Sequence, residues 1–475
     1  MGMGLVKVKV LAIVLVLMLF GSLIGGLAAA QDEVVLRVTG PDWAPNWALA
    51  DISRDFTAHA EEVLGYPVRL EFDLFPWGVY YERLMTALVA GEPVYDIFIA
   101  DSQWLGDLAI NGFIYYLNPI LEEDPELREI MDSMHPVLRS AYGSYPDGSK
   151  HYWGFPAVAD TKLMHARYDL LSHPDERAAF REQYGWDLPL EYEDFLELDW
   201  TRFTDILEFF TREAGETLAG EVLESNFYGL AEQYGKEYDM LIMGLLPHIY
   251  GRGGDIWDRE TRRVQNVLNS DLNVESFEFY ISLLEYCPPG AINYTLYEIN
   301  DAMAAGIVAF AINWGVIAEA LYDPELSVVH DKLITVLPPG HIDVNGEFNR
   351  TSNIGGQPFV IGSATQHIDE VVEFIKWWYR PENATRFAQA GGLGCVEEVV
   401  YSEEFLAMKP WHRAFADSLD HQLDFWKEPP FFEMLTVLQE TFHKAVLGEI
   451  TAREAMDHVA KVHTDILLRW GYLPE

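Results

Sequence analysis

Cysteine and positive charge are both scarce in this sequence. Its only cysteines are Cys287 and Cys395, so a framework of several disulfide bridges is excluded. The sequence does not decide whether these two pair in an oxidising compartment or remain two buried thiols. With two cysteines and scattered histidines there is no tight ligand cluster for zinc. We therefore predict no metal site, no cofactor and no catalytic residues.

The charge balance is strongly acidic. The chain has 32 Lys and Arg against 75 Asp and Glu, which gives a formal net charge of −43. Nucleic acid is excluded as a partner, because phosphate binding needs a basic footprint. The charge could attract a cationic ligand, but the acidic residues are spread along the whole chain. That spread favours a role in solubility, which a saline habitat would also explain.

Long hydrophobic runs are absent except at the N-terminus. Two lysines precede an apolar run over residues 10–27, and the small residues of an A-x-A pattern follow at Ala28 and Ala30. This pattern predicts a secretory signal peptide over residues 1–30. An uncleaved anchor is the alternative, since the run could span a bilayer. Three glycines in the run favour cleavage, and no cysteine is available there for lipid attachment. We expect a periplasmic or secreted protein.

The first part of the mature chain alternates strands with helices. Apolar and β-branched residues predict strands at residues 34–38, 68–72 and 96–100, and helical spacing occupies residues 49–63 and 81–88. This alternation indicates a parallel sheet with helices on its faces. In such sheets ligands bind outside the carboxyl ends of the strands. The segments that follow the three strands are therefore the first place to look for a site.

Each of those three segments carries a tryptophan, and two also carry a carboxylate. An aromatic ring can cover the apolar face of a sugar and exclude water from it. Carboxylates and amides can satisfy the sugar hydroxyls, which would be costly to bury without partners. The candidate residues in these segments are Asp42, Trp43, Trp47, Trp77, Asp101, Ser102, Gln103 and Trp104.

The rest of the chain is richer in helix. A helix, a glycine turn and a strand are predicted over residues 299–312, and Asn313 and Trp314 end that strand. A capped amphipathic helix is predicted over residues 189–212. No internal repeat and no long linker is visible, which favours two lobes joined by chain crossovers. Further helices are predicted over residues 274–284, 368–378, 431–447 and 452–468.

Several motifs together resemble a known family. The chain is similar to the extracellular solute-binding proteins of ABC importers, family 1, the carbohydrate-binding group that includes maltose-binding protein. The order and spacing of these motifs support the resemblance, which covers nearly the whole mature chain. The motifs lie at residues 85–96 (MTALVAGEPVYD), 111–117, 151–156 (HYWGFP), 164–170 (MHARYDL), 302–314 (AMAAGIVAFAINW), 354–361 (IGGQPFVI) and 373–379.

The resemblance implies an α/β, two-lobed periplasmic-binding-protein fold. Each lobe would be a mostly parallel sheet flanked by helices, with the ligand cleft between the lobes. The N-lobe would span residues 31–155 with a returning segment at about 358–405. The C-lobe would span residues 156–357 with C-terminal helices at about 406–475. Crossovers near residues 155–160 and 355–359 would act as hinges, where glycines tolerate the change in dihedral angles.

The resemblance also implies a function. We expect a non-enzymatic, monomeric receptor that captures a mono- or oligosaccharide or a polyol by hinge closure. It would deliver this solute to the transmembrane permease subunits of an ABC importer. By the family's pattern Trp314 would stack on the sugar. The remaining candidates for ligand contacts are Asp160, Arg252, Asn313 and Gln357.

Two alternatives stay open at this point. A secreted polysaccharide-active enzyme would also have a signal peptide, a tryptophan-lined cleft and paired carboxylates. With 75 acidic residues such pairs will occur by chance, and neither a G-x-S-x-G nor an H-E-x-x-H motif is present. The second alternative is the same receptor fold with a solute that is not a sugar, such as an amino acid, a peptide or a metal chelate.

Overall fold

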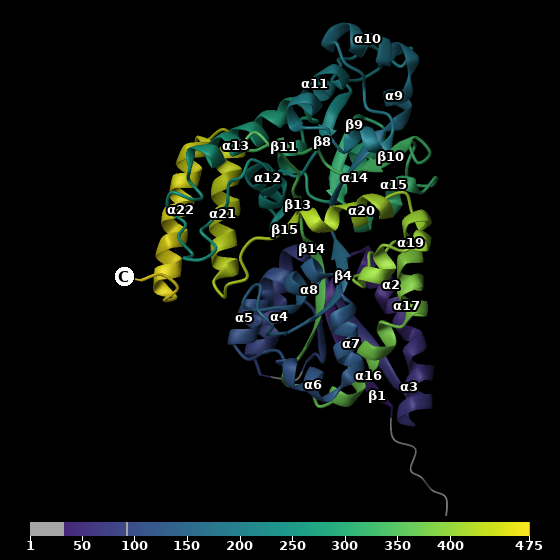
Figure 1. Ribbon diagram of the computed structural model, residues 1–475, viewed down its shortest axis with the longest axis vertical. Helices are drawn as coiled ribbons and strands as arrows, with labels where there is room; N and C mark the ends of the chain where they lie inside the picture. The colour runs from purple at the N-terminus through teal and green to yellow at the C-terminus, as the bar shows by residue number, and fades with distance from the viewer. Residues whose placement is uncertain (1–32, 92–93, 475) are drawn as a thin grey trace, which may run out of the picture.

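The computed structural model describes residues 33–91 and 94–474. The predicted signal peptide, residues 1–30, lies outside this range. Two α/β lobes stand one above the other in Figure 1, each built around its own sheet. The expected two-lobed α/β architecture is confirmed.

The sheet of the first lobe has the strand order β2-β1-β3-β14-β4. The three strands predicted from the N-terminal pattern are present and parallel: β1 (Val34–Pro41) lies between β2 (Val68–Phe75) and β3 (Ile97–Ile99). The other two strands, β14 (Gly355–Ile361) and β4 (Phe155–Asp160), are antiparallel to their neighbours. The carboxyl ends of the parallel strands therefore meet at one edge, which faces the second lobe.

Helices cover both faces of this sheet. Apolar helical faces explain the packing: Phe56 is fully buried and lies 5.3 Å, ring to ring, from Phe374 and 5.5 Å from Trp377. Gly65 ends α3 in a left-handed conformation, with φ of 86°. The helices are α2 (Ala44–Ile52), α3 (Phe56–Leu64), α4 (Trp77–Val89), α5 (Leu105–Ile110), α6 (Asn118–Glu123), α7 (Pro125–Ser133), α8 (Pro136–Gly143), α16 (Ile368–Trp378) and α17 (Pro381–Gln389).

The sheet of the second lobe is mostly antiparallel, which corrects the expectation of a mostly parallel sheet in each lobe. Its order is β10-β5-β9-β8, and only β8 (Tyr228–Ala231) and β9 (Val308–Trp314) are parallel. A parallel neighbour requires a long crossover, usually through a helix. Helices α12 to α14 provide one between β8 and β9. In contrast, β5 (Lys162–Arg167) enters directly from the first sheet and pairs antiparallel with β10 (Leu333–Val336).

Helices also surround the second sheet. Those of the middle of the chain are α9 (Tyr168–Ser172), α10 (Pro174–Tyr184), α11 (Trp200–Phe210), α12 (Met240–Gly251), α13 (Asp271–Ser282), α14 (Tyr297–Ala304) and α15 (Glu319–Tyr322). Short two-stranded sheets are formed by β6 (Thr217–Leu218) with β7 (Glu221–Val222), and by β11 (His341–Ile342) with β12 (Phe348–Asn349).

The C-terminal part of the chain returns to the second lobe. Short helices α18 (Glu397–Val400), α19 (Glu403–Met408) and α20 (His412–Ser418) lead back from the first lobe. Two long helices follow, α21 (Phe431–Val446) and α22 (Ala452–Arg469), and a capping box at Thr451 and Glu454 starts the second. They form the yellow pair at the flank of the molecule in Figure 1, where α21 packs on α12 and α22 on α13.

Three chain segments cross between the lobes side by side. Thr161 alone separates β4 from β5, and Ile354 alone separates β13 (Ser352–Asn353) from β14. The third segment is β15 (Gln422–Leu423), which pairs with β13. The hydroxyl of Thr161 donates to the carbonyl of Asn353 at 2.9 Å. We therefore place the change of lobe at Thr161 and Ile354, a few residues from the expected boundaries at 155/156 and 357/358.

Gly356 occupies a position in the second crossover that other residues would strain. Its φ is 113°, and an added Cβ would lie 2.2 Å from the carbonyl oxygen of Val158. We expect Gly356→Ala to lower the free energy of unfolding by about 1–3 kcal/mol or more, because backbone strain and a steric clash act together. Chemical denaturation would measure it. Gly346→Ala is the control: its φ is 82°, but nothing lies within 4 Å of its Cβ. Equal losses in the two variants would contradict the role of the clash.

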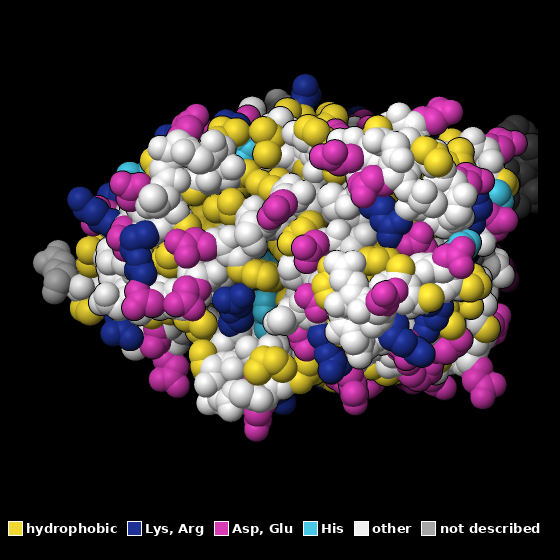
Figure 2. Space-filling view, turned by 90° about the horizontal axis from the view of Figure 1, so that it is seen from above, with side chains coloured by type: hydrophobic (Ala, Val, Ile, Leu, Met, Phe, Trp, Pro, Cys, Tyr) yellow, Lys and Arg dark blue, Asp and Glu magenta, His cyan; other side chains and the backbone are white. Residues whose placement is uncertain are grey.

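Acidic side chains are dispersed over the surface seen in Figure 2, and the two cysteines are not bonded to each other. Figure 2 shows carboxylate side chains spread over the visible face and interspersed with Lys and Arg, without one acidic patch. Cys287 and Cys395 are both buried and free. Within residues 33–91 and 94–474, no helix is both long and apolar enough to cross a membrane. The same residues contain no group of three or more His, Cys, Asp or Glu arranged to hold a metal ion.

Candidate functional site

A pocket lies where the two lobes and the crossovers meet. The space between its lining atoms is about 380 Å³, part of it open to solvent. The first lobe contributes residues that follow β1, β2 and β3, as the sheet topology predicts. The lining residues are Trp43, Trp77, Asp101 and Gln103 from the first lobe; Asp160, Ile354, Gly355 and Gly356 from the crossovers; and Tyr238, Asp239, Met240, Met243, Leu296 and Trp314 from the second lobe.

Aromatic rings from both lobes form one wall. Trp77, the first residue of α4, stacks on Tyr238 of the second lobe, with ring centroids 5.6 Å apart and an interplanar angle of 20°. Trp43 meets Trp77 edge to face at 5.4 Å. The indole nitrogen of Trp43 donates to Oε1 of Gln357 at 3.0 Å. Gln357 is buried beside the pocket and orients this ring without lining the space itself.

Trp314 lies at the end of β9, at the base of the pocket. Only 6% of it is exposed, and its six-membered ring packs against the backbone of the second crossover. A Cβ added to Gly355 would lie 2.3 Å from the indole ring, so the ring is in contact with the glycine itself. Glycine is the only residue that permits this approach. The position of Trp314 is therefore tied directly to the hinge.

Asn313 supports Trp314 from behind. Its amide nitrogen donates to the carbonyl of Leu296 at 2.8 Å and to Oδ1 of Asn300 at 2.9 Å. Its own Oδ1 accepts from the backbone N–H of Trp314 at 3.0 Å. Asn313 is fully buried and does not line the pocket. Its hydrogen bonds hold the strand end rather than a ligand.

Asp101 and Tyr238 join the two lobes at the pocket. The hydroxyl of Tyr238 donates to Oδ2 of Asp101 at 3.1 Å and accepts from the indole nitrogen of Trp104 at 2.7 Å. Trp104 is fully buried behind Tyr238 and does not line the pocket. Tyr238 has a φ of 48°, which is unfavourable for a bulky residue. Strained backbone conformations of this kind cluster at functional sites, where the surrounding structure fixes the residue in place.

A further carboxylate comes from the segment after the third crossover. Asp424 accepts from the hydroxyl of Ser102 at 2.8 Å and from the amide of Gln103 at 3.0 Å. Ser102 is buried and lies outside the lining, whereas Gln103 lines the pocket. Asp424 therefore connects the C-terminal part of the chain to the loop after β3.

The carboxylates of the pocket are strongly perturbed. Burial raises the pKa of Asp101 well above its usual range, and the nearby charges of Asp239 and Asp424 raise it further. Burial also raises the pKa of Asp239 to about 7, with an added contribution from Asp424. Burial raises the pKa of Asp160 as well, although backbone N–H groups partly offset this effect. Perturbed carboxyl groups gathered in a pocket are typical of a functional site.

Several buried polar atoms at the pocket have no hydrogen-bond partner within the described part of the chain. Oδ1 of Asp160 accepts from the backbone N–H of Thr161 at 2.8 Å and of Val316 at 3.1 Å, but its Oδ2 has no partner. The same holds for Oε1 of Gln103, Nε1 of Trp77 and Nε2 of Gln357. Buried polar atoms are rarely left unpaired, so the pocket offers both acceptors and donors to a ligand.

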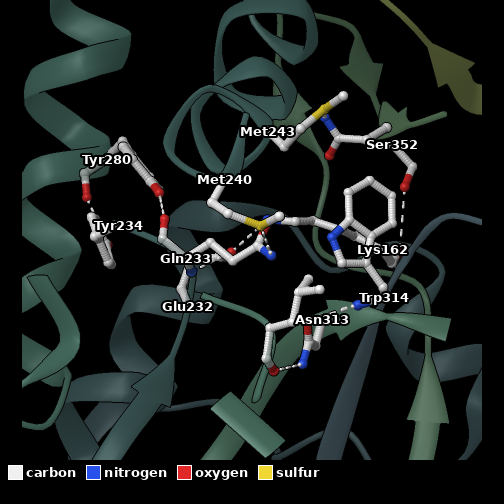
Figure 3. A network of polar contacts seen from close by, with 12 residues as sticks. Lys162, Glu232, Gln233, Tyr234, Met240, Met243, Tyr280, Asn313, Trp314 and Ser352 are labelled. Atoms are coloured by element: carbon white, nitrogen blue, oxygen red, sulfur yellow. Dashed lines mark hydrogen bonds and ion pairs between the residues drawn. The ribbon is translucent and has the colours of Figure 1, made fainter. Parts of the chain in front are cut away.

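A polar network behind the pocket holds its second-lobe wall (Figure 3). Nζ of Lys162 lies 2.8 Å from Oε1 of Glu232 in a fully buried ion pair. The amide of Gln233 donates to the sulfur of Met240 at 3.3 Å. The amide of Asn353, in the crossover, donates to the sulfur of Met243 at 3.2 Å. These contacts fix two flexible side chains that line the pocket.

Three of the residues predicted from sequence lie away from the pocket. Trp47 is 56% exposed, and its indole donates to the exposed carboxylate of Asp42 at 2.7 Å. Trp47 lies one turn into α2, on the helix face opposite the buried Leu49. The guanidinium of Arg252 lies over the ring of Phe279, 4.9 Å from its centroid. We therefore do not propose Asp42, Trp47 or Arg252 as ligand contacts.

Other site residues were missed by the sequence reasoning. Tyr238 and Asp239 lie in the segment between β8 and α12. Because β8 is parallel to β9, its carboxyl end meets the same edge as Trp314. Recognition of that parallel pair would have predicted them. Asp424 has no comparable signal, since its place depends on a short strand pair between distant segments.

Comparison with known proteins gives a consistent result. A family model described as bacterial extracellular solute-binding protein matches residues 54–414. A curated relative from Sinorhizobium fredii, described as a probable amino-acid ABC transporter periplasmic-binding protein, is 21% identical over 88% of this chain and 82% of its own.

Solved structures agree on the fold. Maltose-bound MalE3 of T. maritima superposes with a TM-score of 0.72 at 17% identity, over 91% of this chain and 100% of the other. A solute-binding protein of an ABC transporter from Agrobacterium radiobacter, in complex with ribitol, gives a TM-score of 0.72 at 20% identity, over 91% and 98%.

Proposed function

Because the chain belongs to the family of bacterial extracellular solute-binding proteins, we propose that it is the receptor of an ABC importer. It binds a mono- or oligosaccharide or a polyol between its lobes. The observation that carries this proposal is the pocket at the crossovers, with aromatic rings from both lobes and buried, unpartnered polar atoms from the first lobe and the crossovers.

The pocket suits a carbohydrate or polyol chemically. Trp43, Trp77 and Trp314 offer flat apolar surfaces to a ring or carbon chain. Asp101, Asp160 and the amide of Gln103 offer hydrogen bonds to hydroxyl groups. The structural neighbours named above bind maltose and ribitol, which supports this class of solute.

An amino acid is the second candidate, since the curated relative is described as an amino-acid transporter component. An amino acid needs a cationic partner for its carboxylate, most often Arg. The residues that line the pocket, all of them in the described part of the chain, include no Lys, Arg or His. This observation favours a solute without a carboxylate.

The mode of action follows from the crossovers. Asp160, Ile354, Gly355 and Gly356 line the pocket and belong to the segments that join the lobes. Rotation about these segments would open the pocket to solvent, and a bound solute would favour closure by contacts with both lobes. The permease would recognise the closed form. We also propose that residues 1–30 are removed as a signal peptide, that the receptor is a monomer and that it has no catalytic activity.

A thermal-shift screen of the mature protein tests the proposal. The panel contains monosaccharides, oligosaccharides, polyols, amino acids, peptides and organic acids. A solute that binds only the folded state raises Tm according to RT ln(1 + [L]/Kd), about 2.7 kcal/mol at 100 Kd. We expect a shift with a monosaccharide or polyol and no turnover of that compound. A shift with amino acids alone would reject the carbohydrate assignment, and turnover of an added glycan would reject the receptor.

A further inference from the structure

The pocket gathers acidic side chains without a cationic side chain among the described residues of its lining. Three lining residues are carboxylates, Asp101, Asp160 and Asp239, and Asp424 lies directly behind Gln103. As stated above, no lining residue is a cation. The two lysines whose charges act on this cluster are already paired with other carboxylates. Lys162 lies 2.8 Å from Glu232, and Lys427 lies 2.9 Å from Asp147.

This inference rests on the proposed function. We propose that the solute is an amino sugar or amino polyol, and that the pocket carboxylates bind its protonated primary or secondary amine. A neutral sugar can hydrogen-bond to these groups in either protonation state, so it does not favour their ionised form over their burial and mutual repulsion. An ammonium group both donates hydrogen bonds and offsets that repulsion. The positive charge of the ligand therefore takes the place of a cationic side chain, which the lining lacks.

The unpaired carboxylate oxygen specifies the kind of cation. Oδ1 of Asp160 is occupied by two backbone N–H groups, so Oδ2 is the oxygen left for a ligand, and it is fully buried without a partner. A quaternary ammonium has no N–H and would leave this oxygen unsatisfied. A primary or secondary ammonium donates to it directly. Oε1 of Gln103 and Nε1 of Trp77, on side chains that line the pocket, then remain for hydroxyl groups.

The aromatic wall agrees with this choice. Trp43, Trp77, Tyr238 and Trp314 surround the same space as the carboxylates. The faces of aromatic rings attract a cation through their quadrupole, and this attraction strengthens when water is excluded. A pocket lined by both aromatic rings and carboxylates is thus suited to a carbon chain that carries a positively charged nitrogen.

The inference gives a characteristic dependence on pH. Asp239 is held with a pKa of about 7, and the groups that act on it are Asp101 and Asp424, which disfavour its charge, and Lys162, which favours it. An aliphatic amine stays protonated from pH 5 to pH 8, since its ordinary pKa is about 10. Binding of the amine favours ionised carboxylates, so its affinity should rise with pH over this range. A neutral polyol has no such linkage.

Isothermal titration with matched probes tests the inference. The pairs are 1-amino-1-deoxysorbitol with sorbitol, and 6-amino-6-deoxyglucose with glucose, each at pH 5 and pH 8. We expect an amine to bind at least about tenfold more tightly than its neutral partner at pH 8, because charge-assisted hydrogen bonds are the stronger ones. We also expect the affinity of the amine to rise about tenfold or more from pH 5 to pH 8, and that of the neutral partner to change little.

Asp239→Asn is the variant of choice, because its side chain makes no capping hydrogen bond in the structure. It should weaken binding of the amines by about tenfold and reduce their pH dependence, while neutral probes change little. Asp42→Asn is the matched control, since Asp42 is exposed and lies outside the pocket. It removes the same charge and should leave all affinities unchanged.

The outcomes separate the inference from the proposed function. Neutral probes that bind as tightly as their amine partners, or an amine affinity that does not rise with pH, would overturn the inference and leave the carbohydrate receptor standing. If no probe of either pair binds, both the inference and the assignment to small sugars and polyols fail.

Discussion

Lys162→Met is expected to lower the free energy of unfolding by about 3–5 kcal/mol, the usual result of removing one partner of a buried ion pair. The side chains of Lys162 and Glu232 are 2% and 3% exposed, and the pair spans 2.8 Å. Burial lowers the pKa of Lys162 and raises that of Glu232, and each partner opposes the shift of the other. Each residue therefore favours the charged form of the other.

The measurement is urea denaturation followed by circular dichroism, with two further variants. Replacing both partners by apolar residues, Lys162→Met with Glu232→Leu, should recover most of the loss, since it leaves no unpaired charge. Arg54→Met serves as the surface control. Its partner Asp51 lies 2.9 Å away, and the two side chains are 78% and 71% exposed, so the loss should be about 0–1 kcal/mol. A Lys162→Met loss as small as that of the control would contradict the argument.

Trp314→Ala is expected to weaken solute binding by about 30-fold or more, equivalent to about 2 kcal/mol, because a buried aromatic contact at the centre of a site carries much of its affinity. The ligand for this test is the panel member that gives the largest thermal shift. Titration calorimetry measures the change in Kd, and circular dichroism checks that the variant remains folded. Trp314→Phe, which keeps an aromatic face, should retain part of the affinity.

Trp47→Ala is the matched control for this experiment. It removes the same side chain, but from an exposed position outside the pocket. The Trp47→Ala variant should bind the solute with the same affinity as the unaltered protein. If the Trp314→Ala variant binds the solute within twofold of the affinity of the unaltered protein, Trp314 does not belong to the site.

The local pattern of the chain was sufficient for much of the fold. Strands β1, β2 and β3 and the helices between them follow from periodicity, since each buries one face against a continuous core. The helix predicted over residues 189–212 shows the limit of this reasoning. Its last part is α11, which starts only at Trp200 because Asp199 accepts from the N–H groups of Thr201 and Arg202. A cap of this kind outweighs the periodicity before it.

The pocket could be predicted on the side of the first lobe and much less on the other. Trp43, Trp77, Asp101 and Gln103 follow parallel strands, so one rule places them together. Trp314 was indicated by a family resemblance. Tyr238 and Asp424 required knowledge of strand pairing in a mostly antiparallel sheet and in a two-residue bridge. Non-local pairing of short strands leaves no periodic trace in the sequence.

The three adjacent crossovers restrict how the lobes can move. A single connection would let one lobe both swing and twist against the other. Here the hydroxyl of Thr161 bonds the carbonyl of Asn353, and the N–H of Ile354 bonds the carbonyl of Leu423 at 3.1 Å, so the connections form a narrow ribbon. A ribbon bends readily about the line across its width and resists torsion. Under the proposed hinge motion, such a ribbon would favour bending over twisting, and the rings and carboxylates of the two lobes would meet in the same register at each closure.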